Sequence, residues 1–141
     1  MKKIQLIPVL LMILCGLGSC SKSNDTTAVI VPTSSIITVG NWKITYFVDN
    51  GTDHTSNYAG LKLIFISNGT VTANNDLFSV NGTWSASLSS EDKLLLNFNT
   101  GLQMEQLNHD WHILEKTSIK LRMEDVSGGG GGTRYLTIEK I

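Results

Sequence analysis

The sequence contains little cysteine, and all of it lies near the N-terminus. Cys15 and Cys20 are the only cysteines among 141 residues, so the chain after Cys20 has none. That part can form neither a disulfide nor a thiolate metal site, which are the staples that small exported domains often use. It must therefore be held together by an apolar core, in which the largest side chains are Trp42, Trp84 and Trp111.

Basic residues are not in excess either. The formal net charge of the full chain is −1. Without Lys2 and Lys3, which belong to the leader described below, nine Lys and Arg face twelve Asp and Glu. Nucleic-acid backbones attract proteins through clustered positive charge. We therefore expect no nucleic-acid partner.

The N-terminus has the layout of a secretory signal. Lys2 and Lys3 are followed by an apolar run from Ile4 to Leu17 and then by the small residues Gly18 and Ser19. This order of charge, apolar run and small-residue cleavage site is typical of exported proteins. The run is shorter than the roughly 20 residues that a membrane-spanning helix needs. We interpret residues 1–19 as a signal peptide that is removed on export.

The end of this segment resembles a known lipidation motif. Leu17-Gly18-Ser19-Cys20 is similar to the lipobox of bacterial lipoproteins. The resemblance implies that Cys20 carries acyl chains such as palmitate and becomes the new N-terminus. Two or more chains, at about 0.8 kcal/mol per buried methylene, would hold a soluble domain stably on a membrane. It also implies attachment to the cell envelope, at the periplasmic or surface face of the outer membrane. The alternative is an ordinary signal peptide with an incidental cysteine.

Residues 20–39 form a predicted tether. Its first half is polar, whereas the second half contains the apolar runs Val29–Val31 and Ile36–Val39. Apolar side chains of this kind are unusual in a pure linker. This part of the tether is expected to lie along the domain as an extra strand or as a cover.

Residues 40–141 carry strand signals throughout. Short runs with period-two alternation are separated by Asn-Gly, Asp and Ser clusters, and in the first run Trp42, Ile44, Tyr46 and Val48 share the inward face. The eight predicted strands lie at residues 42–48, 61–65, 71–73, 80–88, 94–98, 111–113, 119–123 and 134–141. Short sequential connections favour an all-β domain, an eight-stranded antiparallel up-and-down barrel without free edges. The alternative is a β-sandwich.

The connections follow from turn chemistry. Asn50-Gly51 ends the first strand, and Asn68-Gly69 predicts a tight hairpin turn in which both residues have positive φ. Asn81-Gly82 indicates another turn or a bulge within a strand. Gln103–Leu107 fits one helical turn, and the five glycines from Gly128 to Gly132 fit a flexible connection before the last strand.

Three short motifs resemble a barrel family. Gly40-Asn41-Trp42 is similar to the Gly-x-Trp that opens lipocalin and calycin barrels. Phe65-x-x-x-Gly69-Thr70 and Gly82-x-Trp84 are similar to the spacing in lipocalin-like lipoproteins of Bacteroidetes. The resemblance implies that Trp42 packs at the closed end of the barrel beneath an arginine of a late strand, either Arg134 or Arg122. Such a cation over an indole contributes about 0.5–2 kcal/mol.

The resemblance also implies a function, namely the binding of a small hydrophobic ligand at the barrel mouth. Loops at residues 49–57 and 128–132 would gate such a site. The side chains expected to line it are Trp42, Tyr46, Phe65, Trp84, Phe98 and Trp111. An eight-stranded barrel is about wide enough for side chains to fill or for one small ligand. The alternative is therefore a filled core, in a structural or protein- or glycan-interaction module of the cell envelope.

We find no convincing catalytic or metal motif in the sequence. His109 and His112 are three apart near a strand, so their side chains are expected on opposite faces. Asp110 and His112 could form an acid–base pair, but no nucleophile is placed beside them. The acidic pairs Glu91-Asp92 and Glu124-Asp125 fit solvated turns better than a calcium loop. We expect no metal, no cofactor and no enzymatic activity.

Overall fold

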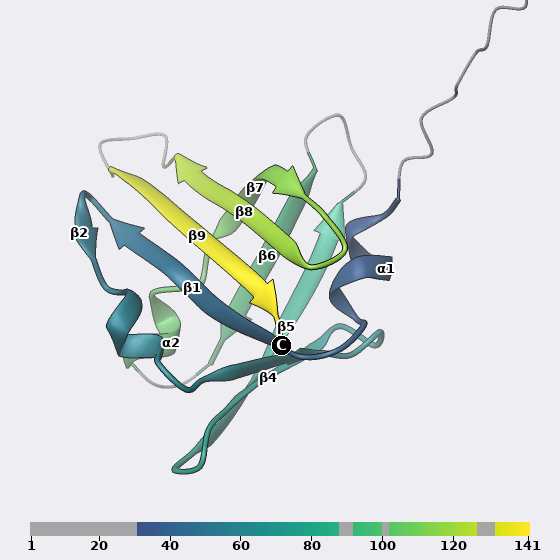
Figure 1. Cartoon of the computed structure of the whole chain (residues 1–141), viewed down its shortest axis with the longest axis horizontal. Helices are drawn as coiled ribbons and strands as arrows, with labels where there is room; N and C mark the ends of the chain where they lie inside the picture. Colours follow the sequence, from purple (N-terminus) through teal and green to yellow (C-terminus); the bar gives the residue numbers. More distant parts are fainter. Residues whose placement is uncertain (1–30, 88–91, 100–101, 127–131) are drawn as a thin grey trace, which may run out of the picture.

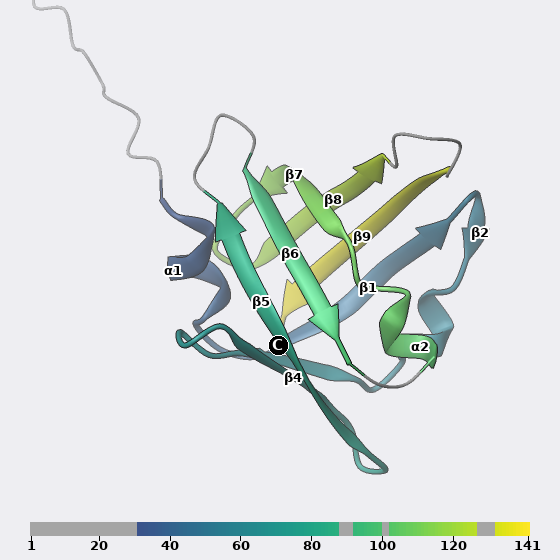
Figure 2. The same cartoon turned by 180° about the vertical axis from the view of Figure 1, so that it is seen from behind.

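The chain folds into a closed antiparallel β-barrel (Figures 1 and 2). A computed structural model describes residues 31–87, 92–99, 102–126 and 132–141. The strands are β1 (Trp42–Asp49), β2 (Thr52–Asp53), β3 (Lys62–Phe65), β4 (Thr70–Asn74), β5 (Ser79–Ser87), β6 (Lys93–Phe98), β7 (Asp110–Lys116), β8 (Lys120–Val126) and β9 (Thr133–Lys140). The helices are α1 (Thr33–Ile37), the 3-10 helix η1 (Thr55–Tyr58) and α2 (Leu102–Glu105).

The strand order confirms the predicted barrel and contradicts the sandwich. Neighbours in the sheet are neighbours in sequence from β3 to β9, and β1 closes the ring by pairing with both β9 and β3. The short strand β2 is an addition at the end of β1, outside the eight that form the ring. β1 is joined to β9 by seven residue pairs but to β3 by the single pair Trp42 and Leu63. We call this weakly joined line between β1 and β3 the seam.

A bulge in β1 shifts its inward face. The pairing with β9 is irregular between Ile44 and Tyr46, so Thr45 is an extra residue in the strand. Such an insertion reverses the alternation of the residues that follow. Tyr46 consequently points outward with 43% of its surface exposed, whereas Phe47 is completely buried. The prediction that Tyr46 lines the interior is therefore wrong.

Two Asn-Gly pairs make turns of different geometry. Asn50 and Gly51 both have positive φ, 51° and 80°, as a two-residue hairpin turn between β1 and β2 requires. In the β3–β4 turn only Gly69 has positive φ, at 87°. The prediction of positive φ at Asn68 is wrong. Its side-chain oxygen instead accepts the backbone N–H of Thr70 at 2.9 Å, which stabilises the turn without a left-handed residue there.

Gly82 lies in the middle of β5 and makes neither a turn nor a described bulge. It pairs with Val71 on one side and with Phe98 on the other, in continuous register. A Cβ at this position would lie 2.5 Å from the backbone oxygen of Asn97 and 2.7 Å from the ring of Phe98. Gly82 is therefore there because the Phe98 ring occupies the space of a side chain.

One end of the barrel is covered by α1, and we call it the α1 end. Ile37 is completely buried, and its backbone oxygen accepts the indole N–H of Trp42 at 2.8 Å. The buried Thr33 hydroxyl donates to Asp92 at 2.9 Å, and Lys116 forms an ion pair with the same carboxylate. The predicted cover is thus confirmed as a helix, and residues 33–37, which the sequence assigned to the tether, belong to the folded body.

The opposite end is covered by η1 and α2, and we call it the α2 end (Figure 2). The predicted helical turn after β6 is confirmed by α2. Tyr58 of η1 is buried and donates its hydroxyl to the backbone oxygen of Gln103 at 2.8 Å. Met104 and Leu107 are buried beside it as members of the core cluster. In the part of the chain that the structure describes, no helix has the length and hydrophobicity needed to cross a membrane.

Candidate functional site

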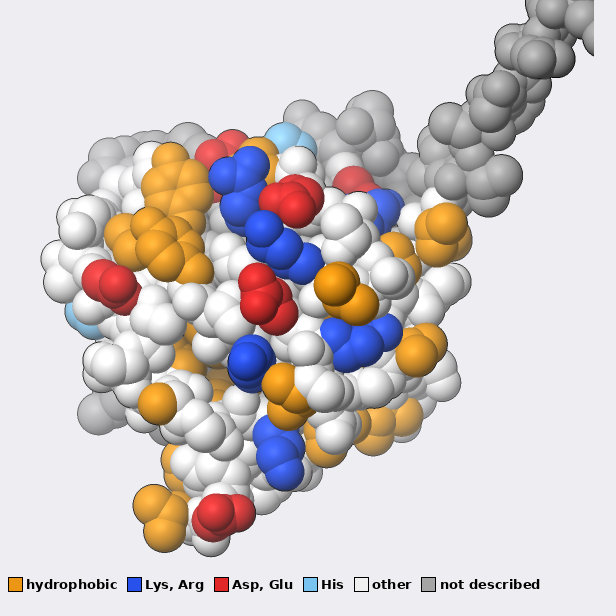
Figure 3. All heavy atoms as spheres, viewed as in Figure 1, with side chains coloured by type: hydrophobic (Ala, Val, Ile, Leu, Met, Phe, Trp, Pro, Cys, Tyr) orange, Lys and Arg blue, Asp and Glu red, His pale blue; other side chains and the backbone are white. Residues whose placement is uncertain are grey.

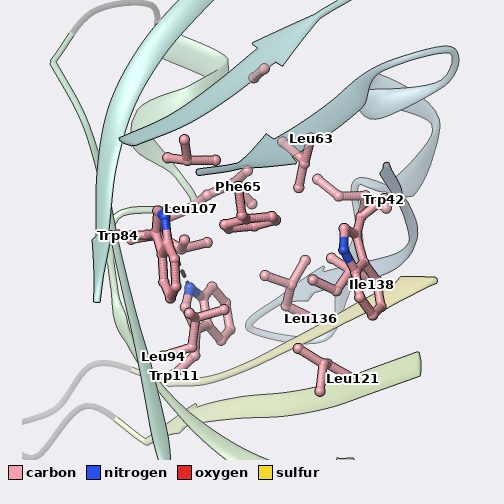
Figure 4. Packing of buried hydrophobic residues seen from close by; sticks show 14 of the residues in the cluster. Trp42, Leu63, Phe65, Trp84, Leu94, Leu107, Trp111, Leu121, Leu136 and Ile138 are labelled. Carbon is pink, nitrogen blue, oxygen red and sulfur yellow. Dashed lines mark hydrogen bonds between the residues drawn. The ribbon is translucent and has the colours of Figure 1, made fainter. Parts of the chain in front are cut away.

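The aromatic residues predicted to line a ligand cavity form the core of the barrel. Trp42, Phe65, Trp84 and Trp111 are buried in one hydrophobic cluster (Figure 4). Phe98 is a member of the same cluster. Phe65 and Trp84 make an edge-to-face contact with ring centroids 5.8 Å apart. Side chains at native packing distances leave little room among themselves. Five of the six predicted lining residues are therefore brought together, but as packing partners of one another.

Each tryptophan also uses its indole N–H to hold a covering segment. Trp42 donates to Ile37 at the end of α1, Trp84 to Ile66 in the β3–β4 turn at 2.9 Å, and Trp111 to Leu107 after α2 at 2.9 Å. The indole N–H is the side chain's single donor. These bonds fix the three rings in place and leave none of those donors for a ligand.

The cation over Trp42 is a lysine and not the expected arginine. Lys140 Nζ lies 5.3 Å from the centre of the Trp42 ring, because the two residues are direct partners in the β1–β9 pairing. Arg134 pairs with Asp49 at the far end of the same two strands. Arg122 points outward on β8 and lies 3.6 Å from Glu115. The prediction that Arg134 or Arg122 covers Trp42 is wrong, since strand register places both elsewhere.

A network of charged side chains occupies the α2 end. Arg134 Nε lies 3.0 Å from Asp49 Oδ1, and its Nη1 lies 3.3 Å from Asp125 Oδ2. His109 Nδ1 lies 3.1 Å from the same oxygen of Asp125, and its ring contacts Trp111 edge-to-face. Burial, with a smaller effect of the nearby Arg134 charge, lowers the pKa of His109. Asp125 is thus largely enclosed in the network and is not the solvated turn residue that the sequence suggested.

The other candidate polar residues form separate surface pairs. His112 Nδ1 lies 4.0 Å from Glu124, on the face opposite to His109. Asp110 pairs with Lys93 at 3.2 Å, so it does not form an acid–base pair with His112. Among the described residues, no group of three or more His, Cys, Asp or Glu side chains could hold a metal ion.

Among the described residues, two grooves on the outside of the barrel are large enough to consider. The larger lies along the seam, has a volume of about 420 Å³, and is lined by Lys43, Ile44, Thr45, Tyr58, Ala59, Gly60, Leu61, Lys62 and Ile141. The smaller, of about 320 Å³, lies between α1 and the β3–β4 turn and is lined by Ser34, Ser35, Thr38, Ser67 and Trp84. Both volumes are within the range of small-molecule sites. The sequence gives no signal for the seam groove, because it depends on how far β1 and β3 diverge.

Of the two loops predicted to gate a ligand site, at residues 49–57 and 128–132, the structure describes mainly the first. Residues 49–57 are structured as a hairpin and η1, in which the Thr55 hydroxyl accepts the backbone N–H of Phe47 at 2.9 Å. Asp53 accepts the Thr55 backbone N–H at 2.8 Å, and its hydrogen bonds with Thr55 lower the pKa of its carboxyl. The glycine run at 128–132 lies, except for Gly132, outside the described residues.

Comparison with known proteins shows the fold and no more. No family model matches the sequence, and no curated protein matches it. A crystal structure of a DUF4847 family protein from Bacteroides vulgatus ATCC 8482 is similar, with a TM-score of 0.55. The alignment has 16% sequence identity and covers 77% of this chain and 96% of that chain. A likeness at this identity supports the barrel architecture alone.

Proposed function

We propose that this chain is a lipid-anchored, lipocalin-like protein of the bacterial cell envelope that acts as an interaction module through its outer surface. One observation carries the proposal. The interior positions of the barrel are occupied by a continuous hydrophobic core, and both ends are covered by packed segments. A ligand entering by the predicted mouth would have to displace Tyr58, Met104 and Leu107, all of which are buried. This arrangement favours the alternative of a filled core over a barrel with an internal ligand cavity.

The proposed anchor is Cys20, within the lipobox-like sequence Leu17-Gly18-Ser19-Cys20. Thr33, the first residue of α1, follows it by thirteen residues. In this proposal the protein is exported, remains on the membrane through its acyl chains, and has no enzymatic activity. Acyl chains rather than a polypeptide span would supply the membrane attachment.

A candidate partner surface lies on the outer face of β1 and β9. Tyr46 and Tyr135 are exposed on these adjacent strands, and their register partners Thr137 and Val48 are buried. Figure 3 shows hydrophobic side chains gathered over this part of β1 and β9. Exposed tyrosines are frequent anchors in protein interfaces, because the ring is large and its hydroxyl tolerates water.

Site-specific photo-crosslinking in the native envelope tests the proposal. A photoreactive residue at position 46 should yield an adduct with a specific partner. The matched control is position 95, since Leu95 is similarly exposed at 47% on the outer face of β6. Equal capture at both positions, or none at either, would refute the assignment of this surface.

Ligand binding remains a second candidate because of the seam groove, whose volume suits a small apolar molecule. Native mass spectrometry of protein extracted from its own envelope separates the two candidates. The filled-core proposal expects the mass of the acylated polypeptide alone. A stoichiometric extra mass that is lost when Ala59 in the groove is replaced by tryptophan would support the ligand instead.

A further inference from the structure

Exposed aliphatic side chains collect at the α1 end of the barrel. Val39 precedes β1, Ile119 lies in the turn between β7 and β8, and Ile141 follows β9; their exposed fractions are 57%, 63% and 56%. Ile66 in the β3–β4 turn is exposed at the same end. Single exposed apolar residues are normal on protein surfaces, whereas several on neighbouring loops mark a contact surface.

Backbone hydrogen bonds place these loops side by side. Lys140 donates its N–H to the backbone oxygen of Ile119 at 2.9 Å, and Ile141 donates its N–H to Asn41 at 2.9 Å, two residues after Val39. Ser67 and Thr38 line one groove, which brings the β3–β4 turn next to α1. Figure 3 shows hydrophobic and basic side chains alternating over this part of the molecule.

Three lysines lie near the aliphatic residues. Lys120 and Lys140 flank Ile119 and Ile141 in sequence, and Lys43 lies on the neighbouring strand β1. Acidic groups partly neutralise them, since Lys120 Nζ lies 3.3 Å from Glu115 and Glu139 is the register partner of both Lys43 and Lys120. Aliphatic side chains with lysines nearby, whose long side chains can extend to the headgroups, are suited to a membrane–water interface.

The chain also enters the folded body at this end. α1 begins at Thr33 and is held to the α1 end by Asp92 and by the Trp42–Ile37 hydrogen bond. The thirteen residues back to Cys20 can extend over at most about 45 Å, so an acylated Cys20 keeps this end within reach of the bilayer. The proposed anchor therefore allows the exposed aliphatic residues to reach the same bilayer.

We infer that the α1 end is a membrane-docking surface, in which Val39, Ile66, Ile119 and Ile141 insert into the interfacial layer of the bilayer to which Cys20 is anchored. This inference rests on the proposed lipid anchor. Docking would orient the barrel with its α2 end away from the membrane. The β4–β5 hairpin, with Leu77 at 91% exposure, would then point outward (Figure 1).

A single introduced cysteine tests the orientation. The processed protein has no cysteine besides Cys20, so a polarity-sensitive dye can be attached at Ile119→Cys without competing thiols once Cys20 is acylated. Leu77→Cys is the matched control, because Leu77 is also exposed but lies at the opposite end. Both substitutions are at the surface and leave the core unchanged. The labelled proteins, processed and acylated, are reconstituted into phosphatidylcholine vesicles with and without phosphatidylglycerol.

The dye at position 119 should shift to the blue and be quenched by lipid-attached quenchers at least about twofold more strongly than the dye at position 77. Phosphatidylglycerol should increase this difference, because the lysines around the patch favour anionic headgroups. Equal emission and quenching at the two positions in protein that co-floats with vesicles would overturn the docking inference and leave the anchor intact. Labelling of Cys20 itself in protein without an added cysteine, together with loss of co-flotation, would instead refute the anchor and the inference that depends on it.

Discussion

Replacing Gly82 by alanine should destabilise the barrel strongly, although alanine is a small and common residue. A Cβ there would lie 2.5 Å from the backbone oxygen of Asn97 and 2.7 Å from Phe98 Cδ1. The oxygen is part of the adjacent strand β6 and cannot move without disturbing the β5–β6 pairing. Overpacking of this kind costs about 1–3 kcal/mol. With a urea dependence of about 1–3 kcal/mol per molar for small proteins, the midpoint should fall by about 1 M.

Urea unfolding followed by tryptophan fluorescence measures this cost, since Trp84 lies two residues away in β5. Thr83→Ala is the matched control: Thr83 is exposed on the opposite face of the strand, so its loss should change stability by less than about 0.5 kcal/mol. Phe98→Leu should relieve part of the clash, so the double variant should cost less than the sum of the single ones. Equal midpoints for Gly82→Ala and Thr83→Ala would refute the close approach described here.

Three further predictions concern the ends of the barrel. Asp92→Asn should remove the ion pair with Lys116 and weaken the hydrogen bond with Thr33, which should lower stability by about 1–2 kcal/mol. Hydrogen exchange in α1 should then increase. Unchanged exchange in α1 would contradict the attachment of this helix through Asp92. Burial raises the pKa of Tyr58 above its usual value of 10.0. The contribution of Tyr58 to stability should therefore be complete below pH 10 and be lost as the pH rises further. Tyr58→Phe should abolish this loss of stability, as measured by unfolding between pH 9 and 11. Because the pKa of His109 is lowered, its contribution to stability is present above pH 6.5 and is lost as the pH falls below that value. His109→Gln should therefore flatten the decline in melting temperature between about pH 7 and 5.

The strand pattern predicts the barrel well because burial imposes a strict alternation along most strands. In β5 and β6 the alternating side chains point as expected, with Trp84, Leu94, Leu96 and Phe98 inward. In β1 the same rule fails after Ile44, because Thr45 is an extra residue that alternation cannot reveal. The prediction of a turn or bulge at Asn81-Gly82 is wrong for a related reason. Glycine is required at position 82 by the Phe98 ring on the next strand, and local sequence does not show that contact.

The ends of the barrel could be predicted less well than its wall. Local composition identifies α2 and an apolar cover at residues 36–39, but not that this cover is a helix or that α2 covers the opposite opening of the barrel. Asp92 seemed a solvated turn residue, yet it binds Thr33, which is 59 residues away in sequence. Likewise Lys140 rather than Arg134 lies over Trp42, because register between the first and last strands decides which cation arrives there. Such long-range pairings are determined by closure of the ring.

The unequal pairing of β1 has a mechanical consequence. A pull on the N-terminal side is transmitted through α1 into β1, which pairs mainly with the antiparallel strand β9. Force along the strand axis would load the hydrogen bonds between β1 and β9 in shear, so they would have to break together and not one after another. β1 and β9 would thus resist extraction together, whereas β1 and β3 would separate easily along the seam.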